Sequence, residues 1–174
     1  MFNNCIQSGI YPNSFKIGQI TPIYKSGDKS LLNNYRPITL LNPLSKIFEK
    51  CLYEQLYNYL LKFNILNPNQ YGFRQGCSTS HAVRKLYDEL VNDLDNNKFT
   101  CTIFLDLKKA FDTVNHQILI QKLEKYGIRG LPLTLLKSYL SNRFQYTVVN
   151  NYKSSLCPVT CGVPQGSTLG PLLF

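Results

Sequence analysis

Two aspartates follow a short apolar segment of this chain, and carboxylates in that position can bind a metal ion. Residues 99–105 (FTCTIFL) form a nearly continuous apolar run bounded by polar residues, which predicts a buried central strand. Asp106 follows it directly, and Asp112 lies one short segment later. A carboxylate at the end of a rigid strand suits Mg²⁺, which takes oxygen ligands. From these residues alone, the alternative is that Asp106 only caps a turn or a helix.

Asp106 lies inside a longer motif, and other motifs precede and follow it. The segment FLDLKKAFDTV (104–114) resembles the first catalytic motif of reverse transcriptases, and GVPQGSTLGPLLF (162–174) resembles the template- and nucleotide-positioning motif that comes next. Upstream, NNYRPITLLNPLSKIFEK (33–50) and NQYGFRQGCSTSHA (69–82) resemble two fingers motifs of reverse transcriptases from jockey-like non-LTR retrotransposons. The resemblance extends from about Phe15 to the end of the sequence.

The resemblance implies a catalytic role for Asp106. It implies that Asp106 binds both catalytic Mg²⁺ ions, with Mn²⁺ as an alternative, and that Leu107 offers a backbone carbonyl near the second ion. Such ions activate the primer 3′-hydroxyl and stabilise the oxygens of the incoming triphosphate during in-line displacement. Asp112 matches an acidic residue typical of this retrotransposon group, and we interpret it as a structural hydrogen-bond acceptor.

The resemblance also implies residues that bind the incoming deoxynucleoside triphosphate (dNTP). Phe111 falls where the family has an aromatic steric gate against a 2′-hydroxyl, the alternative being an ordinary core aromatic. Arg36 resembles a fingers arginine whose planar charged group packs on the base and binds the triphosphate. Gln165 and Gly166 resemble the residues beside the nucleotide and its template base. Further predicted contacts to phosphate or template backbone are Lys25, Lys29 and Arg74.

The flanking sequence predicts the elements that hold these residues. Two extended segments, 17–24 and 35–41, predict strands joined by a polar turn, and Pro22 indicates that the first is an edge strand or an interrupted one. Asn150 and Asn151 predict a second hairpin within 144–160. Apolar residues at helical spacing, with capping residues before them, predict helices over 42–60, 80–95, 115–126 and 132–140.

Composition limits the classes of protein to be considered. A chain of 174 residues is one compact unit or two small subdomains, and a hydrophobic content of 44% argues against disorder. The 19 Lys and Arg against 10 Asp and Glu, a net charge of +9, favour a nucleic-acid partner, the alternative being a merely basic soluble protein.

The cysteines and the termini suggest an intracellular chain. Six single cysteines predict free, buried thiols in a reducing compartment, and their spacing does not fit a zinc site. The sequence shows no signal-peptide layout and no apolar run near the ~18 residues of a membrane span, so no membrane partner is expected. Nucleus and cytoplasm both stay open, as does the oligomeric state.

The resemblance implies an α+β right-hand polymerase. Residues 1–98 would be the fingers region, with an N-terminal arm, a cationic hairpin and helices, and residues 99–174 part of the palm. The family's Asp-Asp hairpin and thumb would come after Phe174, so we expect a fragment truncated before them. Without a neighbouring strand, 99–105 is then expected to expose apolar surface, with marginal stability or aggregation.

The function implied by the resemblance is RNA-directed DNA polymerisation from dNTPs, with an RNA template and a DNA primer as partners. For this chain alone we expect nucleic-acid binding without polymerisation. The alternative is a non-catalytic nucleic-acid-binding remnant of a decayed or domesticated element.

Overall fold

The computed structural model describes residues 1–174, a chain of mixed α and β structure that divides into two compact units, with all of its strands in the first. The first unit contains residues 1–57 and 109–174, and the second contains residues 58–108. The predicted division into fingers and palm at residue 98 stays a prediction. None of the helices is both long enough and apolar enough to cross a membrane.

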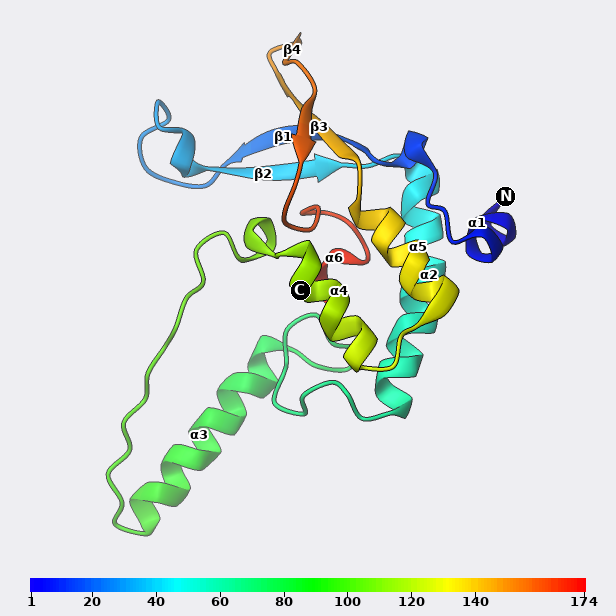
Figure 1. Cartoon of the computed structure of the whole chain (residues 1–174). Helices are drawn as coiled ribbons and strands as arrows, with labels where there is room; N and C mark the ends of the chain where they lie inside the picture. The colour runs from blue at the N-terminus through cyan, green and yellow to red at the C-terminus, as the bar shows by residue number, and fades with distance from the viewer. The chain divides into compact units, whose positions relative to one another are not determined.

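The first unit is built on one sheet, visible in Figure 1. Strand β1 pairs antiparallel with β2 and parallel with β3, and β3 also pairs with β4 and β5. The predicted strands 17–24 and 35–41 are confirmed within one residue. The strand bounds are β1 (Ile17–Tyr24), β2 (Tyr35–Leu40), β3 (Arg143–Val149), β4 (Tyr152–Lys153) and β5 (Cys157–Val159).

Two local sequence signals explain details of this sheet. The pairing of β1 with β3 ends at Ile20, so Pro22 lies where β1 has only β2 beside it and a missing N–H costs no ladder bond on the other side. The strand is continuous rather than interrupted, and Pro22 lies in the part of β1 that is at the edge of the sheet, as the first of the two predicted alternatives requires. Asn150 and Asn151 have φ values of 48° and 68°, the left-handed conformation that a two-residue hairpin turn needs, which confirms the second predicted hairpin.

The four predicted helices are all present. Ser78 accepts a hydrogen bond from the His81 N–H at the start of α3, and Asn115 caps α4 in the same way. The helix bounds are α1 (Phe2–Ser8), α2 (Pro43–Lys62), α3 (Thr79–Asp95), α4 (His116–Lys125), α5 (Gly130–Leu140) and α6 (Gly170–Leu173). Short 3₁₀ turns are η1 (Asn13–Phe15), η2 (Leu32–Asn34) and η3 (Ala110–Thr113).

An aromatic cluster between α2, α5 and the N-terminal arm forms the core of the first unit. The Phe48 ring stacks on Phe2 and Tyr11, with ring centroids 4.7 and 5.4 Å apart, and Tyr11 meets the Tyr139 ring edge-on at 5.0 Å. Phe48, Tyr11 and Tyr139 are fully buried. Because these rings come from three elements, they fix α2 and α5 against each other below the sheet (Figure 1).

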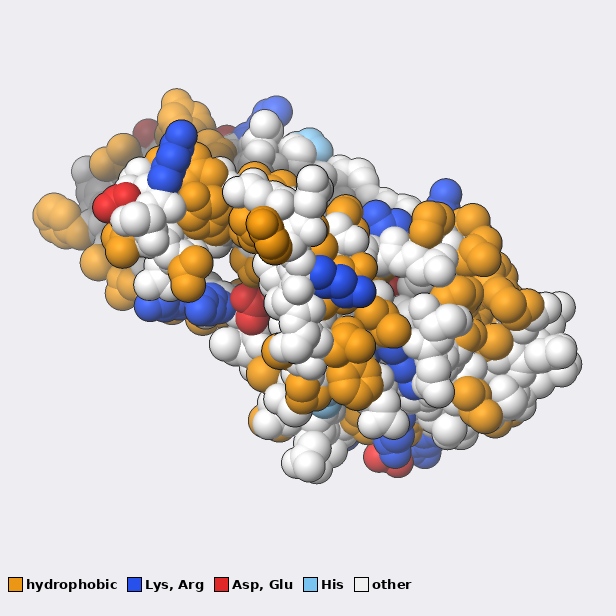
Figure 2. All heavy atoms as spheres, turned by 90° about the horizontal axis from the view of Figure 1, so that it is seen from above, with side chains coloured by type: hydrophobic (Ala, Val, Ile, Leu, Met, Phe, Trp, Pro, Cys, Tyr) orange, Lys and Arg blue, Asp and Glu red, His pale blue; other side chains and the backbone are white.

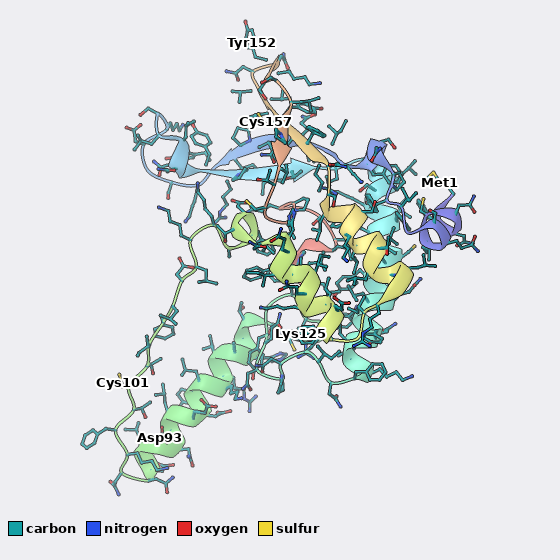
Figure 3. All side chains as sticks on the ribbon, in the orientation of Figure 1. Met1, Asp93, Cys101, Lys125, Tyr152 and Cys157 are labelled. Atoms are coloured by element: carbon teal, nitrogen blue, oxygen red, sulfur yellow. The ribbon has the colours of Figure 1, made fainter.

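The predicted buried strand over 99–105 is wrong. These residues have no regular secondary structure, no strand pairs with them, and the Phe104 and Leu105 side chains are 82% and 88% exposed. A strand needs a neighbour for its backbone N–H and C=O groups, and none is present here. Figure 3 shows the segment around Cys101 as an extended ribbon with its side chains pointing away from it. The expected exposure of apolar surface is therefore confirmed.

Residues 99–108 are expected to exchange their backbone amide hydrogens close to the rate of an unfolded peptide. No backbone hydrogen bond protects their N–H groups, whereas α5 is hydrogen-bonded and carries several buried leucines. Hydrogen exchange followed by mass spectrometry on the purified chain would compare peptides from 99–108 and 133–140. Equal protection of the two peptides would contradict this structure of the segment.

All six cysteines are free thiols, but the prediction that they are buried is wrong. Cys101 lies on the unpaired segment, and Cys157 lies on the short strand β5. Cys5 and Cys77 are half-buried, and the exposed cysteines are Cys51, Cys101, Cys157 and Cys161.

Candidate functional site

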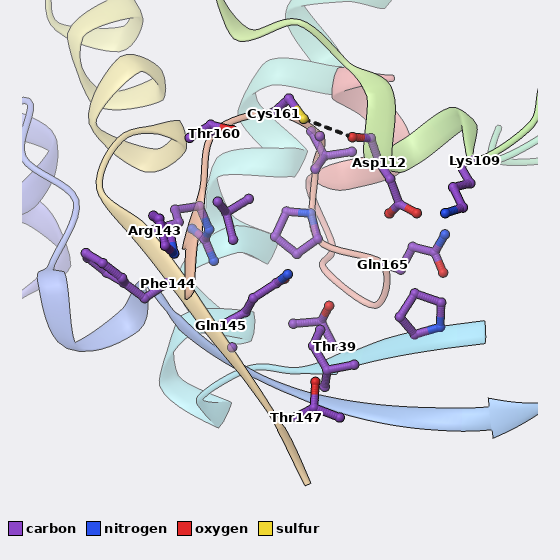
Figure 4. A pocket seen from close by; sticks show the side chains of 18 residues that line it. Thr39, Lys109, Asp112, Arg143, Phe144, Gln145, Thr147, Thr160, Cys161 and Gln165 are labelled. Atoms are coloured by element: carbon purple, nitrogen blue, oxygen red, sulfur yellow. Dashed lines mark hydrogen bonds between the residues drawn. The ribbon is translucent and has the colours of Figure 1, made fainter. Parts of the chain in front are cut away.

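The first unit contains a pocket of about 440 Å³ between the sheet and the segment 158–165. Figure 4 shows Lys109, Asp112 and Gln165 toward one end of it and Arg143 and Phe144 toward the other. Since the walls carry both charged and amide groups beside apolar ones, the pocket can hold a ligand with polar and apolar faces. The side chains lining it that can bind polar groups include Thr39, Lys109, Asp112, Arg143, Gln145 and Gln165.

Two predicted site residues, Gln165 and Gly166, form a tight turn against β2. The Thr39 N–H donates to the Gln165 carbonyl oxygen at 2.8 Å. Gly166 has a φ of 107°, and a Cβ placed on it would lie 2.8 Å from the Thr39 carbonyl oxygen. Glycine is therefore required for two reasons, the backbone conformation and the close approach of this turn to β2. The half-buried Gln165 side chain lines the pocket from this turn.

The segment before this turn pairs with the segment after the unpaired region, so the two motifs at 104–114 and 162–174 meet. The Val163 N–H donates to the Phe111 carbonyl oxygen and the Gly162 N–H to the Val114 carbonyl oxygen, each at 2.8 Å. A Cβ on Gly162 would lie 2.8 Å from the Asp112 backbone. The His116 Nε2 lies 2.7 Å from the Gly162 carbonyl oxygen and helps hold this contact.

Phe111 and Asp112 are placed differently within this contact. The Phe111 ring is half-buried and stacks on Phe174, with centroids 5.0 Å apart. The Asp112 carbonyl oxygen accepts a hydrogen bond from the Cys161 thiol at 3.3 Å, while the Asp112 carboxylate lines the pocket. Burial raises the pKa of Asp112, and the nearby Lys109 charge partly opposes that shift.

Arg143 forms a buried positive wall of the pocket that sequence reasoning missed. Its side chain is only 3% exposed, donates through Nη1 to the Tyr139 carbonyl oxygen at 3.0 Å and lies over the Tyr139 ring at 4.8 Å. Lys16 is also buried, with its Nζ 3.5 Å from the Ser138 hydroxyl oxygen. Burial, aided by the Arg143 charge, lowers the pKa of Lys16. Arg143 begins the strand β3, and nothing in the sequence around it indicates that this basic side chain is buried.

Glu49 is the second residue that sequence reasoning missed. It lies fully buried on α2, and its Oε2 accepts hydrogen bonds from the Thr168 and Leu169 N–H groups at 2.7 and 3.3 Å. Its Oε1 accepts a hydrogen bond from the Ser45 hydroxyl at 3.3 Å. Burial raises the pKa of Glu49, and the two backbone N–H groups oppose this shift. The available signal was the position of Glu49 inside the motif at 33–50, directly after Phe48.

The predicted phosphate contacts of the hairpin lie on the surface, outside the pocket lining. Lys25 and Arg36 are exposed, and Lys29 places its Nζ 5.5 Å from the centre of the Tyr24 ring. Figure 2 shows Lys and Arg side chains in several separate places on this face, among apolar side chains and few acidic ones. Such a surface can attract a polyanion without a single continuous basic stripe.

The other predicted site residues lie in the second unit, so they are not among the residues that the first unit brings together. Asp106 and Leu107 are exposed on the unpaired segment. Arg74 donates through Nη1 to the Asn67 carbonyl oxygen at 2.7 Å, while its buried Nε has no hydrogen-bond partner. No group of three His, Cys, Asp or Glu residues could hold a metal ion by itself. A single carboxylate still fits Mg²⁺, because that ion commonly completes its shell with substrate phosphates and water.

Comparisons with known proteins agree with the motif resemblance. The sequence profile of the family described as reverse transcriptase (RNA-dependent DNA polymerase) matches residues 23–174. In Drosophila melanogaster, the protein described as "Probable RNA-directed DNA polymerase from transposon BS" is 35% identical over 181 residues, covering 100% of this chain and 19% of the relative. The RNA-directed DNA polymerase from mobile element jockey of the same organism is 33% identical over 175 residues, with the same coverage. The chain thus spans about a fifth of the length of these relatives.

Proposed function

The chain belongs to the reverse transcriptase (RNA-dependent DNA polymerase) family, and from that premise we propose that it is the fingers and part of the palm of a non-LTR retrotransposon polymerase. In this proposal residues 1–98 form the fingers region and residues 99–174 the palm portion. The partners are an RNA template, a DNA primer and dNTPs. The observation that carries the proposal is the meeting of residues 111–114 with 161–163 next to the Gln165 turn and the pocket.

The residues of the first unit would position the nucleotide and its template base. Gln165 and the Gly166 backbone face β2, so a base placed at the turn would have an amide and a narrow backbone surface beside it. Phe111, on the adjoining segment, would limit the space at the sugar. Arg36, with its planar charge, and Lys25, with its point charge, are exposed on the hairpin and would bind triphosphate oxygens.

Asp106 would hold Mg²⁺, or Mn²⁺, together with the Leu107 carbonyl and the triphosphate. The chemistry supplied by the bound ions is activation of the primer 3′-hydroxyl and stabilisation of charge on the leaving pyrophosphate. What this chain supplies is a carboxylate on an exposed segment, with Lys109 and η3 directly after it.

Primer extension tests the polymerase proposal. The 174-residue chain with an RNA template, an annealed DNA primer, dNTPs and Mg²⁺ is expected to bind the duplex without extending it, while the longest protein that carries this sequence is expected to extend the primer. Extension by the chain alone would contradict the prediction of inactivity. Failure of the longer protein to extend would favour the binding remnant instead.

Binding of single-stranded RNA by the chain is expected to weaken as the salt concentration rises. Lys and Arg side chains that contact phosphates release counterions from the RNA, and this release is less favourable at high salt. Each phosphate contact contributes about 0.7 to the steepness of log affinity against log salt. Lys25→Gln is expected to reduce that slope by about one contact, whereas Lys125→Gln, at the end of α4, serves as a matched control and leaves it unchanged. Fluorescence anisotropy across a salt series measures both, and a flat slope for the unaltered chain would remove the electrostatic argument.

A further inference from the structure

The turn that carries Gln165 and Gly166 is fixed on both sides by the same β2–α2 segment. On one side, the Thr39 N–H on β2 donates to the Gln165 carbonyl oxygen at 2.8 Å. On the other side, the Oε2 atom of Glu49 on α2 accepts hydrogen bonds from the N–H groups of Thr168 and Leu169 at 2.7 and 3.3 Å. Only Gly166 and Ser167 lie between these two attachments. The turn therefore has little freedom to move relative to β2.

The Glu49 carboxylate is held in one orientation by its own surroundings. Its other oxygen, Oε1, accepts a hydrogen bond from the Ser45 hydroxyl. The Ser45 hydroxyl oxygen in turn lies 2.9 Å from the Tyr11 hydroxyl oxygen. Ser45 and Tyr11 are fully buried, as Glu49 is. Without the two N–H groups of the turn, this buried carboxylate would have only the Ser45 hydroxyl in place of its water molecules. The burial of Glu49 and its binding to the turn therefore depend on each other.

We propose that Glu49 is a positioning residue for the incoming dNTP and its template base, acting by fixing the Gln165–Gly166 turn against β2. This inference rests on the proposed function. Glu49 touches neither ligand in this assignment; its carboxylate sets where the Gln165 side chain and the Gly166 backbone lie. The contact joins residues 119 positions apart, one in the motif at 33–50 and the other in the motif at 162–174, so neither motif alone reveals the pairing.

A carboxylate is better suited to this contact than a neutral group. One carboxylate oxygen can accept two N–H groups, and charge-assisted hydrogen bonds are about twice as strong as neutral ones. In Glu49→Gln the amide oxygen can still accept, but the charge is lost and the amide NH₂ needs acceptors of its own. Glu49→Gln should therefore keep the helix packed while loosening the turn.

The first measurement is amide exchange in the 174-residue chain. Glu49→Gln is expected to speed exchange at the Thr168 and Leu169 amides by about tenfold, while α5 amides stay protected. Glu124→Gln, the same substitution at an exposed residue of α4 in the first unit, is the matched control and should leave exchange at these two amides unchanged. Unchanged exchange at Thr168 and Leu169 in Glu49→Gln would overturn the inference.

The second measurement separates positioning from folding. In the longest protein that carries this sequence, Glu49→Gln is expected to raise the KM for dNTP by about tenfold with a smaller change in kcat, because the nucleotide meets a less ordered turn. A purely structural role would lower the amount of active protein and leave KM unchanged, which would overturn the inference. Should the unaltered protein bind no dNTP, the proposed function would fail while amide exchange still reported on the turn.

Discussion

Asp106→Asn is expected to lower RNA-templated primer extension by about a thousandfold or more in the longest protein that carries this sequence. Asparagine keeps the size of the side chain but removes the charge that makes aspartate a strong Mg²⁺ ligand. Asp106 is exposed and makes no hydrogen bond or ion pair in the structure, so the substitution should not affect folding. The loss would therefore report on metal binding.

Asp95→Asn provides the matched control for Asp106→Asn. Asp95 is an exposed aspartate in the same unit, the last residue of α3, and the substitution removes the same charge. Primer extension should stay unchanged in Asp95→Asn, and both variants should keep their affinity for RNA at fixed salt. Activity of Asp106→Asn within about tenfold of the unaltered protein would refute the role of Asp106 as the main metal ligand.

Local structure could be predicted from the sequence because its signals are local. The strands 17–24 and 35–41 follow from β-branched residues around a polar turn, and the Asn150–Asn151 turn from two residues that tolerate left-handed φ. The cap at Ser78 likewise depends only on its own neighbours.

The strand prediction at 99–105 failed for the opposite reason. An apolar run reports that a segment can pair and be buried, but pairing requires a second strand from elsewhere in the chain. The sheet of this structure consists of β1 to β5, and none of them pairs with this run. The same residues therefore expose their side chains, although their composition is that of a core strand.

The candidate site was predicted in its motif residues and missed in its supporting ones. Gln165, Gly166 and Phe111 were identified through their resemblance to family motifs, which run along the chain. Glu49 holds the backbone after the turn, 119 positions along the chain, so its neighbours in sequence do not indicate its partner. Arg143 binds Tyr139, four residues before it, but only the folded chain places Arg143 on the pocket wall.

Gly166→Ala is expected to destabilise the first unit by about 2–5 kcal/mol and to remove dNTP binding at the turn. A side chain at the φ of 107° is strained, at a cost of about 1–2 kcal/mol. The new methyl group would also lie 2.8 Å from the Thr39 carbonyl oxygen, and such overpacking costs about 1–3 kcal/mol more. Because the Thr39 carbonyl is part of a strand, relief requires the turn to move away from β2. Urea denaturation and dNTP titration would measure the two effects.

Gly130→Ala separates the two costs. Gly130 also has a left-handed φ, 61°, but no atom lies within 4 Å of the position that its Cβ would occupy. It should therefore show the backbone strain alone, about 1–2 kcal/mol, and leave dNTP binding intact. If Gly166→Ala cost no more than Gly130→Ala and still bound dNTP, the close contact between this turn and β2 would not exist in solution, and the turn could not be positioned from β2 and α2.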